Sequence, residues 1–456
     1  MAGIVDTITG GVYTFVIGAN ILYDFHVRDF SGEEDEETYD PHQHRKVEKP
    51  TSYSDTMIHL LKGSIGAGVL AMPSAVARMG VPGSIFGMTL IGTFAAYCMQ
   101  LLIGAQYKLC KRARRGYVAY PRCMFIAVQA GPPAFRWAAT PLYYFGQGFS
   151  LNGSCWLHCK AILKIEFAQV FDFYGVEISL RAHLCILLIP LTLLGLVKDL
   201  KLMTPLSTIS NVVTMLGFIL VFFYLIEDDV EFDDEKFKLK TLSDIPVFIG
   251  TALFALEAVG VVTLEYNMEE PRRFVGLCGL FNIGMTIIVS LYLTMGVFGY
   301  LKYGDEIEPS ITLNLPQEQK KAQAAKLTFA LAIFLSFPLQ NFVAYSIIWR
   351  KIKKKASFSE KSMNVLDYVL RLILVFVPWI VAVGVPRLGP FISLFGAFCL
   401  SLLAVVFPGL LDVCLRYPSE YGPAHYRLIR DLLIIFLGLA CLLSGCYTSV
   451  LEILHY

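Results

Sequence analysis

Long apolar runs recur along the chain from residue 55 almost to its end. The hydrocarbon core of a bilayer is about 30 Å thick, so a helix needs about 20 residues to cross it. Runs near this length are Asp55–Ala77, Gly83–Tyr107, Trp137–Leu163, His183–Val197, Pro205–Ile226, Ile245–Tyr266, Phe274–Tyr303, Lys326–Trp349, Leu366–Val385, Leu388–Leu411 and Leu428–Val450. The pattern therefore predicts an all-α polytopic membrane protein with about eleven transmembrane helices.

The composition agrees with a membrane protein and argues against polyanionic partners and a metal site. Of 456 residues, 55% are hydrophobic and only 16% are charged, whereas soluble domains carry about 25% charged residues. The net charge of +1 gives no reason to expect nucleic acid or another polyanion as a partner. The 11 cysteines are scattered and form no CxxC pair, so we expect buried thiols rather than a metal site. The expected surroundings are the lipid bilayer.

The charges between the runs alternate in sign. Basic residues follow the even-numbered runs, as at Lys108–Arg122 and Arg350–Lys355, and acidic residues follow the fifth and seventh, as at Glu227–Asp229 and Asp305–Glu308. Lysine and arginine collect on the cytoplasmic side of membrane proteins. We therefore expect a cytosolic N-terminus. Residues 1–50 are predicted to be a largely disordered cytosolic tail, and residues 51–456 the transmembrane domain.

The first run contains a glycine cluster in mid-span. Gly63, Gly66 and Gly68 precede Pro73, and each glycine costs about 1 kcal/mol relative to alanine inside a helix. The cluster predicts a broken helix whose free N–H groups suit a carboxylate. We expect Gly66 to be a point of close approach in this carboxylate site, so that Gly66→Val abolishes uptake. The alternative is that the glycines only allow close packing of helices.

The sixth run carries a single carboxylate in mid-span. Glu257 lies within Phe254–Val262, which is otherwise apolar. Intramembrane acids usually mark proton or ion paths. The alternative is a protonated Glu257 that hydrogen-bonds a neighbouring carbonyl. The first and sixth runs are five apart, as expected for an inverted repeat with broken helices in corresponding positions.

Several motifs together make the chain similar to a known family. They are His59–Pro73 (HLLKGSIGAGVLAMP), Leu206–Val212 (LSTISNV), Phe254–Val262 (FALEAVGVV), Ser310–Pro316 (SITLNLP), Phe337–Gln340 (FPLQ) and Pro390–Ala397 (PFISLFGA). The sequence resembles the amino acid/auxin permease superfamily, and within it the proton-assisted amino acid transporters of animals. The resemblance covers roughly Thr51 to Val450. One departure is Ala258, where relatives usually have glycine after the sixth-helix glutamate.

The resemblance implies a LeuT-like fold of five plus five helices with the substrate between broken helices 1 and 6. It implies symport of protons with small neutral amino acids such as glycine, alanine or proline, with protons as the coupling ion and no cofactor. His59 and Glu257 are the expected proton-coupling residues. The expected substrate-binding residues are Gly63, Ser64, Ile65, Gly66, Ala67, Gly68, Phe254 and Glu257.

Two other classes of function are alternatives to transport. A transporter-like amino acid sensor or scaffold with little flux is the main alternative, favoured by Ala258 and the acidic tail. An enzyme is not expected, because the sequence has no nucleophile elbow, no HExxH motif and no phosphate-binding loop. The expected location is the plasma membrane or a lysosomal or endosomal membrane.

Overall fold

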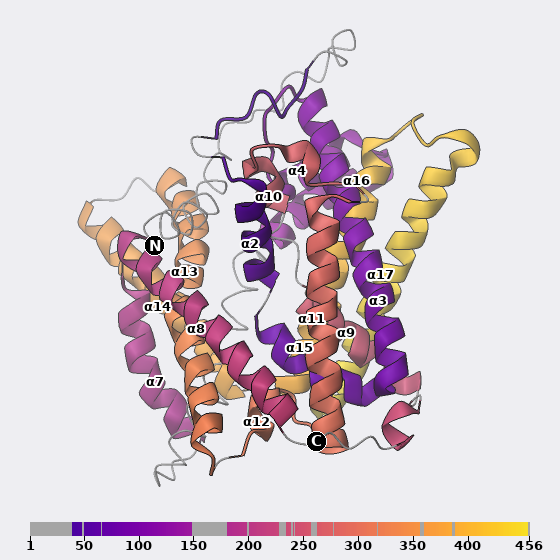
Figure 1. Cartoon of the computed structure of the whole chain (residues 1–456). Helices are drawn as coiled ribbons and strands as arrows, with labels where there is room; N and C mark the ends of the chain where they lie inside the picture. Colours follow the sequence, from indigo (N-terminus) through magenta and orange to yellow (C-terminus); the bar gives the residue numbers. More distant parts are fainter. Residues whose placement is uncertain are drawn as a thin grey trace.

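The computed structural model describes residues 39–47, 50–64, 66–147, 180–197, 200–227, 234–238, 240, 242–256, 262–276, 278–316, 318–355, 360–384 and 388–454. These residues are nearly all helical (Figure 1), as the sequence predicts. Within them, the only pairing of strand type is a single parallel bridge between Thr51 and Met268.

The helices follow the predicted apolar runs. Their bounds are α2 Tyr53–Ser64, α3 Ala67–Arg112, α4 Tyr120–Ala130, α7 Leu180–Gly195, α8 Leu200–Glu227, α9 Ile245–Ala255, α10 Val262–Asn267, α11 Leu280–Tyr303, α12 Ile311–Asn314, α13 Lys320–Lys355, α14 Glu360–Gly384, α15 Leu388–Phe395, a π-helix Gly396–Val406, α16 Phe407–Leu415 and α17 Tyr426–Leu454. Residues 139–147 are also helical.

Many of these helices suit a membrane. Among the described residues, 6 helices are long and apolar enough to cross a bilayer, and two shorter apolar helices span Cys185–Gly195 and Ile245–Ala255. The predicted run Trp137–Leu163 falls largely on residues 148–163, which lie outside the described residues. The predicted number of about eleven spans therefore remains a prediction, while the multi-helix membrane architecture is confirmed.

Helix α3 joins the first two predicted runs across a kink. Gly80 has φ +73° inside this 46-residue helix, a left-handed conformation that glycine adopts without a steric penalty. A Cβ at Gly80 would lie 2.2 Å from the Lys238 carbonyl oxygen. The chain therefore reverses at Gly80, and its second half returns to Arg112. We call the two ends of the molecule the Gly80 end and the Arg112 end.

The charged loops lie at these two ends as the sequence predicts. At the Gly80 end, the Lys240 N–H donates to the Met79 carbonyl, and the Lys240 ammonium group pairs with Asp305. At the Arg112 end, the Arg112 guanidinium group pairs with Glu420 and donates to the Leu415 carbonyl. The loops after the fifth and seventh runs thus lie opposite the basic loop after the second run.

The core lies where α3 packs against α9 and α11. Helix α9 also packs against α15 and the π-helix, whereas α8 packs against α13 and α7 against α14. Figure 1 shows α7, α8, α13 and α14 together on one side, and α16 and α17 on the other. Helices α9, α11 and α15 lie between them, together with the first half of α3.

Two features at the Arg112 end add to the sequence prediction. Helix α4 lies between the second and third predicted runs; its side chains Cys123, Met124 and Ile126 are buried and it packs against α16. Residues 39–47 belong to the tail that is predicted to be largely disordered, and they lie against the region after α10; the disorder of the tail as a whole stays a prediction. The Arg45 guanidinium group donates to the Met268 carbonyl at 2.7 Å. Tertiary contacts, which composition does not reveal, hold both segments.

Candidate functional site

The predicted break in the first run is present in the structure. Helix α2 ends at Ser64 and α3 begins at Ala67. Gly66 between them is extended, with φ −153° and ψ −151°, and Ile65 lies outside the described residues. The chain therefore leaves the helix within the predicted stretch Gly63–Gly68.

The start of α3 is an uncapped helix N-terminus. Gly66 has no side chain to cap it, and the first turn contains no acidic residue. The first N–H groups of a helix lack carbonyl partners within the helix. Here the Val69 N–H reaches the Gly66 carbonyl at 3.1 Å. The end of a helix that presents free N–H groups carries partial positive charge and suits a carboxylate.

The second break follows α9. This helix ends at Ala255, and α10 begins at Val262. Glu257 and Ala258 fall between them, outside the described residues. The last carbonyl groups of α9 form a helix C-terminus, which carries partial negative charge and suits a cation such as an ammonium group.

These two helix ends touch each other. A Cβ added to Gly68 would lie 2.5 Å from the Ala255 Cα and 3.0 Å from its Cβ. At Gly66, by contrast, no described atom lies within 4 Å of an added Cβ. Gly68 is therefore the residue of the cluster that faces the neighbouring backbone, and the expected close approach of substrate at Gly66 stays a prediction.

A buried tyrosine on α11 spans both breaks. The Tyr292 side chain is completely buried. Its hydroxyl lies within hydrogen-bond distance of the Ser64 carbonyl and, at 2.8 Å, of the Ala255 carbonyl. One hydroxyl proton can be donated to only one of these acceptors at a time. The role of Tyr292 was not predicted from the sequence. A tyrosine in the middle of an apolar run nevertheless indicates a buried hydroxyl that needs a hydrogen-bond partner.

The other predicted side chains lie at different distances from the breaks. Ser64 is buried, and its Oγ has no hydrogen-bond partner among the described residues. His59 is partly buried on α2, about one helical turn before Gly63. Phe254 is buried and packs edge-on against Phe395 of α15, with ring centroids 6.4 Å apart. The structure thus brings Ser64, Gly68 and Ala255 together, and places Phe254 in packing between helices.

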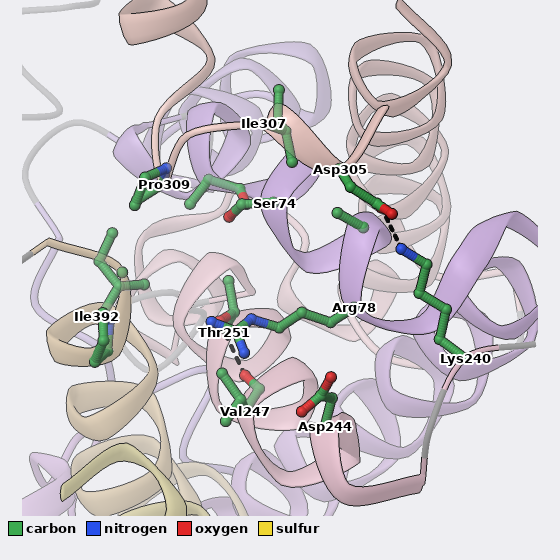
Figure 2. Close-up of a pocket in the computed structure, with 14 residues that line it drawn as sticks. Ser74, Arg78, Lys240, Asp244, Val247, Thr251, Asp305, Ile307, Pro309 and Ile392 are labelled. Carbon is green, nitrogen blue, oxygen red and sulfur yellow. Dashed lines mark hydrogen bonds and ion pairs between the residues drawn. The ribbon is translucent and has the colours of Figure 1, made fainter. Parts of the chain in front are cut away.

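A cavity of about 320 Å³ opens at the Gly80 end and leads toward the breaks. Figure 2 shows the side chains that line it. Its inner residues include Ala71 on α3 and Thr251 on α9, each about one helical turn from a break. The cavity volume lies at the small end of the range for small-molecule sites. The cavity thus lies between the Gly80 end of the molecule and the paired helix ends.

Comparisons with known proteins agree with a transporter. Residues 49–451 match the family described as transmembrane amino acid transporter protein. The chain is 35% identical over 420 residues to the Drosophila melanogaster "proton-coupled amino acid transporter-like protein pathetic", covering 91% of this chain and 88% of the relative. It is 25% identical over 416 residues to "vacuolar amino acid transporter 3" of Saccharomyces cerevisiae, covering 89% of this chain and 57% of the yeast protein.

The solved structures add a weaker similarity. A Na⁺-coupled sialic acid symporter in a substrate-bound outward-open state superposes with a TM-score of 0.47 at 12% identity. The superposition covers 98% of this chain and 96% of the symporter. The matched family and the two relatives from D. melanogaster and S. cerevisiae are described as transporters rather than enzymes. The family match extends over most of the chain, and the chain therefore belongs to the transmembrane amino acid transporter family.

Proposed function

We propose that this protein is a proton-coupled symporter of small neutral amino acids of the glycine, alanine and proline class. The observation that carries the proposal is the contact between Gly68, at the start of α3, and Ala255, at the end of α9. A zwitterionic amino acid has a carboxylate for the first helix end and an ammonium group for the second. The contact between these ends leaves little space beside them, which favours a substrate with a small side chain.

The proposal includes an arrangement of about eleven helices in a LeuT-like five-plus-five inverted repeat, with the N-terminus in the cytosol. Two features support this arrangement. The breaks lie in the first and sixth predicted runs, and the basic loops gather at the Arg112 end. The proposed membrane is the plasma membrane or that of lysosomes or endosomes. The D. melanogaster relative is named as proton-coupled and the yeast relative as vacuolar.

The test is uptake of labelled glycine, alanine and proline into proteoliposomes with and without an inward proton gradient. We expect uptake of at least one of them to increase with the gradient and to collapse when a protonophore is added. Uptake independent of the proton gradient would refute the coupling. Specific binding without flux would instead assign the protein to the sensor class.

The variant Tyr292→Phe tests whether the paired breaks take part in amino acid uptake. The variant removes only the hydroxyl that lies between the Ser64 and Ala255 carbonyls. A hydrogen bond contributes about 1 kcal/mol, so we expect the uptake rate to fall about fivefold to tenfold. Tyr421→Phe is the matched control, since it removes a buried hydroxyl bonded to the Val413 carbonyl at the Arg112 end. Equal effects of the two variants would argue against the site.

A further inference from the structure

The cavity at the Gly80 end has charged groups around its mouth. Arg78 comes from α3, and Asp305 lies just after α11. Lys240 and Asp244 lie in the segment that leads into α9. The lining residues thus carry two positive and two negative charges. Figure 2 shows all four side chains at the cavity.

The Lys240 ammonium group has partners within the wall. It pairs with the Asp305 carboxylate, drawn as a dashed line in Figure 2, and lies 5.4 Å from the centre of the Tyr300 ring. Burial alone would lower the pKa of Lys240, but the hydrogen bonds to Asp305 and Tyr300 raise it above its ordinary value. Lys240 and Asp305 therefore neutralise each other.

The Arg78 guanidinium group has a separate partner. It pairs with Glu452 of α17 through bonds of 2.6 and 3.3 Å. The two side chains remain 30% and 25% exposed. A guanidinium group has five N–H donors, and Glu452 accepts from only two of them. A carboxylate that enters the cavity can therefore bind the remaining N–H groups of Arg78.

Asp244 is the charged group in this wall that lacks a partner. Among the described residues, nothing forms a hydrogen bond or ion pair with its carboxylate, and it does not cap α9. Figure 2 shows the Asp244 carboxylate and the Arg78 guanidinium group on the same cavity, with no bond drawn between them. With Glu452 counted, the wall holds three carboxylates and two cations. It therefore attracts a positively charged group.

The hydroxyls deeper in the cavity also present acceptors. Ser74 donates to the Ala71 carbonyl at 2.8 Å, and Thr251 donates to the Val247 carbonyl at 2.9 Å. Because each hydroxyl proton is used within its own helix, the oxygen lone pairs remain for a donor in the cavity. An ammonium group is such a donor.

We propose that this cavity is a second, outer amino acid site, where Asp244 binds the ammonium group of a zwitterionic amino acid and Arg78 binds its carboxylate. The site lies between the Gly80 end and the paired breaks. It loads the substrate before the substrate reaches Gly68 and Ala255. The inference rests on the proposed function, because it takes the transported amino acid as its ligand.

The test measures alanine uptake into proteoliposomes over a range of alanine concentrations. Asp244→Asn keeps the size of the side chain and removes its charge. We expect its KM for alanine to rise about tenfold while kcat stays within about twofold. Asp244→Glu restores the charge and should keep KM within about threefold of the wild-type value. Glu308→Gln is the matched control, an exposed carboxylate at the same end but outside the cavity, and it should leave KM unchanged.

Propionate, which is alanine without its amino group, separates recognition from a structural effect. If Asp244 binds the ammonium group, the inhibition constant of propionate should change less than about twofold in Asp244→Asn, whereas KM for alanine rises. A rise of both constants by the same factor would overturn the outer site. So would an Asp244→Asn variant with wild-type KM, or one altered only in its response to Na⁺ or protons.

The wild-type protein separates this inference from the proposed function. Absence of wild-type uptake of alanine, glycine and proline would overturn both proposals. Normal wild-type uptake together with unchanged kinetics in Asp244→Asn would overturn the outer site alone.

Discussion

Two glycines of the first break differ in what surrounds them. A side chain at Gly68 would enter the backbone of Ala255, whereas one at Gly66 would enter space that is open among the described atoms. Gly66 also has an extended φ of −153° that any residue adopts. We expect Gly68→Ala to lower uptake at least about tenfold, because overpacking costs about 1–3 kcal/mol. Gly66→Ala should retain more than about half of the wild-type rate.

The comparison is made at equal amounts of reconstituted protein, so that a folding defect is not taken for a transport defect. A Gly68→Ala variant with wild-type uptake would show that α3 and α9 separate during transport, or that their contact is unimportant.

His59 is the residue at which proton coupling is expected. It is partly buried on α2, about one turn before Gly63. The ordinary pKa of histidine, about 6.5, allows its charge to change near neutral pH. We expect His59→Ala to flatten the dependence of uptake on external pH between about 5.5 and 7.5, measured beside wild type and Glu257→Gln. A wild-type pH profile in His59→Ala would move the coupling role to Glu257.

At the scale of single residues, the sequence reveals those residues that would destabilise a regular helix at their positions. The cluster Gly63–Gly68 reveals a break because glycine is unfavourable in a helix. The sequence does not reveal which of these glycines faces another backbone, since that depends on how α3 packs on α9. For the same reason the role of Tyr292, which lies 228 residues from Ser64 in sequence, follows only from the fold.

Among the elements, the segment before α2 is the least expected. The described residues 39–47, 50 and 51, which we call the strap, cross the end of α10 at the Arg112 end. The Thr51 N–H donates to the Asn267 carbonyl at 2.9 Å, and the His42 imidazole contacts the Glu265 carboxylate at 2.8 Å. The Arg45 guanidinium group donates to the Tyr266 carbonyl at 2.6 Å. The strap thereby links the start of α2 to the half-helix that follows the second break.

Arg45→Met should loosen the strap while keeping the length of the side chain. The variant loses charged hydrogen bonds to several backbone carbonyls, each contributing about 1.5–3 kcal/mol. We expect amide hydrogen exchange in residues 39–52 to become at least about tenfold faster. Arg272→Met is the control, because it removes one pair with Asp40 whose arginine is 77% exposed, and it should have a much smaller effect. Equal protection in Arg45→Met and wild type would contradict the anchoring role of Arg45.

The ion pair between Asp40 and Arg272 persists at mildly acidic pH. Burial alone would raise the pKa of Asp40, but hydrogen bonds from the His42 N–H and the Arg272 guanidinium group lower it below the ordinary 3.8. A carboxyl group with a lowered pKa stabilises the fold above its unfolded pKa and loses this effect as pH falls through the folded value. The contribution of Asp40 to the strap is therefore complete above pH 3.8 and is lost only below it.

Elements with a regular apolar pattern were predicted to within a few residues, as at α8 and α17. The run Leu388–Leu411 was predicted as one helix, but the structure divides it into α15, the π-helix Gly396–Val406 and α16. Hydrophobicity does not distinguish these backbone geometries. A Cβ at Gly396 would lie 1.9 Å from the Gly250 carbonyl oxygen, so the close packing of α9 explains the small residue there.

For the whole molecule, loop charge predicted which segments lie together. The segments around Lys240 and Asp305 meet at the Gly80 end, and those around Arg112 and Glu420 meet at the opposite end. The prediction from loop charge succeeds because helices that cross a bilayer alternate in direction. Each loop can therefore lie on only one of the two sides of the membrane. The number of crossings is harder to predict, because run Trp137–Leu163 is interrupted by polar residues and run His183–Val197 is short.

The remaining prediction concerns which end faces the cytosol, and one-residue glycosylation sequons test it whatever the final compartment. Leu239→Asn creates a sequon with Lys240 and Thr241, beside the Gly80 end, and Lys355→Asn creates one with Ala356 and Ser357, after α13. Asparagine sequons receive glycans only on the lumenal side of the endoplasmic reticulum. In an Asn152→Gln background, which removes the natural sequon, we expect Leu239→Asn to acquire a glycan and Lys355→Asn to acquire none.

The paired design makes the outcome decisive, because each variant is the control for the other. The expected readout is a slower band on a gel for Leu239→Asn that returns to its original position after treatment with a glycosidase. A glycan on Lys355→Asn alone would invert the topology, since the basic loops would then face away from the cytosol. It would also move the outer cavity at Asp244 to the cytosolic side, so that Asp244 would act in release of substrate rather than in its uptake. Glycans on both variants would place both residues on the lumenal side. An even number of membrane crossings would then lie between them, and the charge pattern, which assigns them to opposite sides, would be wrong.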